Sequence, residues 1–165
     1  ASICGADNKC AKSVVDTLGV AEDANTEYSN YVIGDVVQVN SARKLTEMQV
    51  NLVLPAPREL RWVVFEETSQ TVYTAKQDWI TSNQTGSGYF SSGAISYALK
   101  AGKTYLFAVS ITGGNTSIAY LDNAPFTLNA SFGTVLGRVE SSYASVINVY
   151  PDSQYLYQMK LTTTP

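Results

Sequence analysis

The stretch that most constrains the fold is residues 59–111, where short apolar runs alternate with turn signals. The runs 60–67, 71–75 and 104–111 are rich in β-branched and aromatic residues, and glycines at 86, 88, 93 and 102 lie between the second and the third. Runs of this kind, bounded by turn residues, predict strands. Because no helix-length apolar stripe interrupts them, the stretch predicts an antiparallel all-β domain.

Further candidate strands extend this pattern over residues 30–165. In the run 44–54, Met48, Val50, Leu52 and Leu54 alternate with polar residues, and prolines at 55 and 57 are expected to end the strand. Roughly nine to eleven short strands separated by turns are typical of a two-sheet antiparallel β-sandwich of the jelly-roll type. An immunoglobulin-like sandwich has the same pattern, so the strand order stays open.

Residues 1–29 differ from the rest and are predicted to form an N-terminal appendage. Ala11, Val14, Val15 and Leu18 have the spacing of a short amphipathic helix. Lysines in its first turn would oppose the helix dipole. The acidic run 21–27 is expected to be a linker or loop.

The two cysteines, Cys4 and Cys10, belong to this appendage. A single close pair around a polar loop favours a local disulfide in an oxidising compartment, and two free thiols are the alternative. So short a ring would stabilise the segment by about 2 kcal/mol and would not hold the domain together.

A set of residues spread over 59–111 resembles β-sandwich modules of bacterial secreted and surface proteins. The shared pattern is an apolar strand ending in Phe-Glu, then a Trp, glycine-rich spacing, and Ser-Ser-Gly followed by Leu-x-Ala-Gly-Lys-x-Tyr. Here the residues are Phe65, Glu66, Trp79, Gly86, Gly88, Ser91, Ser92, Gly93, Leu99, Ala101, Gly102, Lys103 and Tyr105. The resemblance covers about a third of the chain, and it implies a non-catalytic module without implying any binding residue.

Charge and composition argue against several partners. Charged residues make up 15% of the chain, against roughly 25% in an average protein, and the net charge is −3. No basic stripe is present, so we expect no nucleic-acid partner. No apolar run approaches roughly 18 residues, so we expect no membrane span.

The absence of histidine argues against much of enzyme chemistry. No Ser-His-Asp or Cys-His constellation can form, and Glu66 and Glu67 would point to opposite faces of one strand. We therefore expect no enzymatic activity and no cofactor. Calcium binding is the alternative to a chain without cofactors. The local acidic clusters lack the spacing of a known calcium loop, and solvated turns are the simpler explanation of them. These clusters are Asp7-Asn8, Glu22-Asp23 with Glu27, and Asp122-Asn123.

Aromatic side chains are the better candidates for a binding surface, since sugar rings stack on flat aromatic faces. Trp79 lies in a polar neighbourhood, and Tyr89 follows the glycine turn. Tyr120, Asp122 and Asn123 form a second small group. Packing at the edge of the core is the simpler interpretation of Trp79.

Three sequons provide candidate N-glycosylation sites, at Asn83, Asn115 and Asn129. All three fall at predicted turns or strand ends, where a glycan could be tolerated.

Two functions follow from these features. The leading prediction is a non-catalytic extracellular or cell-surface binding and adhesion module, whose partner is a carbohydrate or another cell-surface or matrix component. The alternative is a structural subunit of a surface assembly, a filament or matrix, that self-associates through residues 1–29. The two differ in whether that segment packs on its own domain or contacts another chain.

Overall fold

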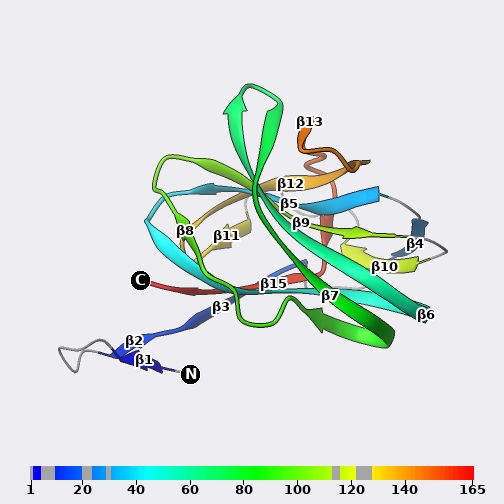
Figure 1. Cartoon of the computed structure of the whole chain (residues 1–165). Helices are drawn as coiled ribbons and strands as arrows, with labels where there is room; N and C mark the ends of the chain where they lie inside the picture. Colours follow the sequence, from blue (N-terminus) through cyan, green and yellow to red (C-terminus); the bar gives the residue numbers. More distant parts are fainter. Residues whose placement is uncertain (1, 5–9, 20–23, 29–30, 113–115, 122–127) are drawn as a thin grey trace.

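The computed structural model describes residues 2–4, 10–19, 24–28, 31–112, 116–121 and 128–165, and within these ranges every regular element is a strand (Figure 1). The all-β prediction is therefore confirmed. The strands are β1 (Ser2–Cys4), β2 (Cys10–Lys12), β3 (Val14–Leu18), β4 (Ala24–Tyr28), β5 (Tyr31–Val39), β6 (Arg43–Ser69), β7 (Val72–Ser91), β8 (Tyr97–Leu99), β9 (Thr104–Ile111), β10 (Thr116–Leu121), β11 (Leu128–Ala130), β12 (Gly133–Ser142), β13 (Val146–Asn148), β14 (Leu156–Tyr157) and β15 (Met159–Thr164).

All strands except β1 and β2 belong to one antiparallel sheet, which is nearly closed as a barrel. Its main path runs β11-β12-β5-β9-β6-β10-β14, and β6 also pairs with β7, β8 and β15. The predicted division into two sheets is not confirmed, because continuous pairing through β6 joins the strands into one sheet. We call this closed part the barrel.

β6 is long enough to pair with different strands along its length. Residues 44–50 pair with β15, residues 60–66 pair with β9, and β7 pairs with β6 from Gln49 onward. Pro55 and Pro57 do not end the strand, contrary to expectation. They fall where the register with β7 shifts between Leu54 and Arg58, and such an irregularity tolerates residues that cannot donate to the ladder.

The barrel interior holds the main core. The predicted alternation in residues 44–54 is confirmed, because its apolar residues are buried. Trp62 is also fully buried, and its Nε1 donates to Thr81 Oγ1 at 3.0 Å. The largest fully buried side chains of this core are Trp62, Tyr105, Tyr157, Phe107 and Phe132.

A second, smaller core lies on the other face of β5, β6, β9 and β12. Residues 143–152, which include β13 and which we call the strap, contribute Ile147 and Val149 to it. The strap is attached through its backbone, because Ala75 N donates to Ser145 O and Val149 N donates to Thr71 O, both at 2.8 Å.

The predicted N-terminal helix is wrong. Residues 14–18 form β3, which pairs with β15 from Leu18↔Met159 to Val14↔Thr163. Leu18 enters the core, while Val15 points outward with 56% of its surface exposed. Three of the five residues of β3 are β-branched, and the unpaired edge of β15 offers them a backbone partner, so tertiary pairing overrides the helical spacing.

Candidate functional site

The N-terminal hairpin, β1 with β2, is separate from the barrel, and we call it the arm. Figure 1 shows the arm standing clear of the other strands, joined to them only where β2 leads into β3. Within the described residues its two strands pair only with each other, and the register places Cys4 directly opposite Cys10.

β3 fills the gap that would otherwise separate β15 from the end of β11, and we call this gap the seam. On one side, β3 pairs with β15. On the other side, Asp16 closes the barrel with its side chain: Ser131 N donates to Asp16 Oδ1 at 2.6 Å, and Ser131 Oγ donates to Oδ2 at 2.7 Å. Side-chain bonds rather than a ladder thus hold the far side of the seam.

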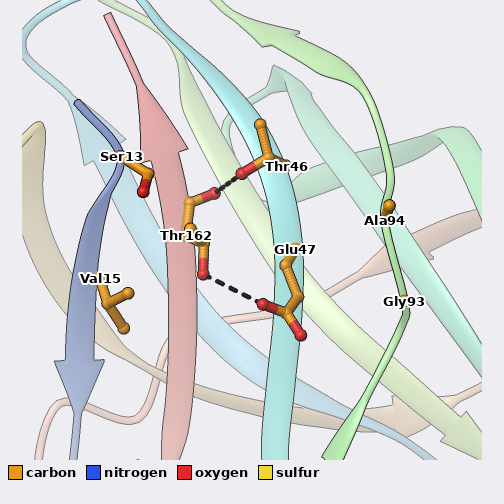
Figure 2. Close-up of a pocket in the computed structure, with 7 residues that line it drawn as sticks. All are labelled: Ser13, Val15, Thr46, Glu47, Gly93, Ala94 and Thr162. Carbon is orange, nitrogen blue, oxygen red and sulfur yellow. Dashed lines mark hydrogen bonds between the residues drawn. The ribbon is translucent and has the colours of Figure 1, made fainter. Parts of the chain in front are cut away.

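A hollow of about 500 Å³ lies on the outer face of the barrel beside the seam (Figure 2). Figure 2 shows three strands forming its floor, β3, β15 and β6, with the segment after β7 along one rim. The lining residues are Ser13, Val15, Thr46, Glu47, Gly93, Ala94 and Thr162.

A β-bulge shapes the floor of this hollow. Thr162 pairs with Glu47 but Thr163 pairs with Leu45, so Thr46 is an extra residue in β6. Thr46 Oγ1 donates to Thr162 O at 3.1 Å, and Thr46 O accepts from Ile95 N at 2.9 Å. These bonds fix the bulge between β15 and the rim.

The half-buried carboxylate of Glu47 is held by three donors. Ser91 Oγ and Gln49 Nε2 donate to Oε1 at 2.6 and 2.9 Å, and Thr162 Oγ1 donates to Oε2 at 3.4 Å. A fixed carboxylate among hydroxyl and methyl groups can accept further hydrogen bonds from a ligand hydroxyl or ammonium group.

The polar outer face continues from Glu47 along β6, β7 and β15. Asn51 Nδ2 donates to Gln158 Oε1 at 2.7 Å. Tyr89 lies opposite Asn51 in the register and is 38% exposed, and Lys160 Nζ lies 3.7 Å from the centre of its ring. Partial burial raises the pKa of Tyr89, so its hydroxyl remains a donor at neutral pH.

Of the predicted aromatic residues whose side chains the structure describes, Tyr89 alone lies on this face. Trp79 is partly buried and packs against the main core, in agreement with the simpler interpretation. Tyr120 lies in β10, where the structure describes only the backbone, and Asp122 and Asn123 lie outside the described residues.

The predicted modification sites are exposed where the structure describes them. Asn83 is exposed and has a positive φ of 57° at an irregular part of β7. Asn129 is exposed on β11, two residues before the Ser131 that binds Asp16. Asn115 lies outside the described residues.

Several residues of the site were missed by sequence reasoning. Asp16 was hidden by the helix prediction, and Thr162 was not considered as a site residue. Glu47 is one of the polar residues that alternate with the buried ones in 44–54, but nothing in its spacing indicated its partners.

One buried acid lies apart from these features, in the interior of the barrel. Asp35 on β5 is fully buried, and its Oδ1 accepts from Tyr157 N at 3.0 Å. Burial raises the pKa of Asp35 well above its usual range, while the bond from Tyr157 and the positive charge of Arg138 act in the opposite direction.

Neither a search for metal and membrane features nor a comparison with known proteins assigns a function to the site. In the described part of the chain no cluster of three or more Cys, Asp or Glu residues could hold a metal ion, and no helix there is long and apolar enough to cross a membrane. The acidic clusters considered for calcium lie at residues whose side chains are not described. No protein-family model and no curated protein matches this sequence.

Proposed function

We propose that this chain is a structural subunit of an extracellular surface assembly, in which the N-terminal segment contacts a neighbouring copy. The observation that carries the proposal is the arm, a separate two-stranded sheet that stands clear of the barrel (Figure 1). An isolated two-stranded hairpin is at best marginally stable in water. Docking against another copy would supply the partner that the arm lacks in its own barrel.

The register of the arm supports the predicted disulfide and, with it, an oxidising environment. Cys4 and Cys10 are directly opposed. Opposed Cα atoms in an antiparallel pair lie about 4.5–5.5 Å apart, within the range that a disulfide spans. A disulfide here would preserve the hairpin before and after docking, and it would be typical of a secreted protein.

Light scattering on two forms of the chain tests the proposal. The full chain is expected to form concentration-dependent species larger than a monomer, and a chain lacking residues 1–12 is expected to stay monomeric. The deletion retains β3, so the barrel keeps its described contacts. A full chain that is monomeric at every concentration would contradict the proposal.

A second candidate function, carbohydrate binding, is favoured by the outer face. Asn51, Gln158 and Glu47 present amide and carboxylate groups beside the exposed ring of Tyr89, a combination that suits sugar hydroxyls and a sugar ring. A glycan array comparing the native chain with Tyr89→Ala tests this candidate. Tyr150→Ala is the matched control, since that ring is exposed away from this face; equal binding by all three proteins would remove Tyr89 from the site.

A further inference from the structure

The strand β3 has the properties of an element that can be exchanged between copies. It is the first strand of the barrel in the sequence, and within the described residues it has a backbone partner on one side only, β15. Its other side is held by the bonds between Asp16 and Ser131. Removing β3 would therefore open the seam and leave every other described strand pair in place.

The seam is shaped to receive this particular strand. Leu18 is buried in the main core with 2% of its surface exposed. Gly19, which follows it, has a φ of 63°, and a Cβ at this position would lie 2.6 Å from the carbonyl oxygen of Tyr157. A side chain that fills the core and a glycine that permits close backbone approach together define a seat for the end of β3.

None of these contacts depends on β3 belonging to the same chain as the seam. Its backbone and side-chain partners come from Ser131 and from residues 157–163, more than one hundred positions further along the sequence. A β3 from a second copy would make the same contacts at no loss of burial or hydrogen bonding. It would also carry its arm to the neighbouring copy.

We propose that β3 of one copy occupies the seam of the next copy, so that the N-terminal segment links subunits head to tail. This inference rests on the proposed function as an assembly subunit. A head-to-tail contact that does not close on itself generates a filament. The single chain described here is the closed form, in which β3 fills its own seam.

Pairwise disulfide trapping distinguishes the two arrangements. Val15 and Thr162 are directly opposite in the register of β3 and β15, and both face outward. Two full-length variants, Val15→Cys and Thr162→Cys, are co-refolded, concentrated and oxidised. A Val15→Cys chain mixed with Ser87→Cys, whose thiol is exposed on β7 away from the seam, controls for random cross-linking.

Strand exchange predicts that the yield of disulfide-linked chain pairs in the first mixture is several-fold above that in the control mixture. The bond should join position 15 of one chain to position 162 of the other in a disulfide-linked pair of peptides. A first mixture that cross-links no more than the control would overturn the inference. A chain carrying both substitutions in one molecule shows that the pair can bond, because it closes within the chain when β3 fills its own seam.

Light scattering of the native chain tests the proposed function separately from strand exchange. Large species without the cross-link would overturn strand exchange alone and leave the arm as the contact. A native chain that is always monomeric, with no cross-link in the mixture, would overturn both.

Discussion

At the scale of single residues, the buried carboxyl group of Asp35 is expected to make the free energy of unfolding depend on pH. Its pKa is raised by burial, so the folded chain keeps a proton that the unfolded chain loses above about pH 4. The free energy of unfolding therefore falls as the pH rises from about 4 toward the folded-state pKa. Asp35→Asn removes this titration and leaves an oxygen to accept from Tyr157 N.

We expect Asp35→Asn to gain stability relative to the native chain as the pH rises above about 4, by up to about 1.4 kcal/mol for each unit of the raised pKa. Urea unfolding at a series of pH values measures the difference. Asp78→Asn, at an exposed ion pair with Arg61, is the matched control and should show a small, nearly constant difference. A pH-independent difference for Asp35→Asn would contradict the assignment.

Any side chain at Gly34 is expected to clash with the neighbouring strand. β5 pairs regularly at this glycine with Ala108 and Val139. A Cβ at Gly34 would lie 2.0 Å from the carbonyl oxygen of Phe107, so the glycine serves close backbone approach. Gly34→Ala is expected to lower the free energy of unfolding by about 1–3 kcal/mol, measured in urea.

Gln38→Ala is the control for Gly34→Ala, because Gln38 lies on the same strand and is exposed. It should change the unfolding midpoint little. Similar effects of the two substitutions would mean that the approach of β9 to Gly34 is looser than described.

At the scale of elements, the strap should contribute stability through one face only. Ile147 is 4% exposed over the second core, whereas Val146 beside it is 54% exposed. Ile147→Ala is expected to cost about 2–4 kcal/mol of unfolding free energy, and Val146→Ala less than about 0.5 kcal/mol. Equal costs would show that the strap does not cover the sheet as described.

The seating of β3 gives a graded prediction. Asp16→Ala removes both bonds to Ser131, and Ser131→Ala removes only the bond from Oγ. Losses of about 1–2 and about 0.5–1 kcal/mol are expected, with faster hydrogen exchange of the β3 amides in the same order. Unchanged exchange in Asp16→Ala would show that the seam is held by β15 alone.

The elements also show how far the sequence alone could go. Alternation identified the buried face of 44–54, because that stretch has one face in the core, whereas both faces of 104–111 are buried. It failed for β3, whose apolar residues fit a helix equally well until β15 is known to lie beside them. The bulge at Thr46 and the bonds of Asp16 depend on residues distant in sequence, so no local pattern could predict them.

At the scale of the whole molecule, the strand content was predictable but the closure was not. Counting strands cannot reveal that β6 reaches both ends of the molecule and merges the expected two sheets into one. The position of the arm was equally out of reach, since it depends on where β3 joins the barrel. The position of the arm is the reason why we propose an assembly subunit rather than a binding module as the function.

The most direct test of the N-terminal segment as a subunit contact is sedimentation velocity of the native full chain over a wide range of concentrations. The same chain with Cys4 and Cys10 reduced is run beside it. Species that grow with concentration are predicted, and the proposed Cys4–Cys10 disulfide predicts that they shrink on reduction. A single monomeric boundary at every concentration in both states would contradict the claim.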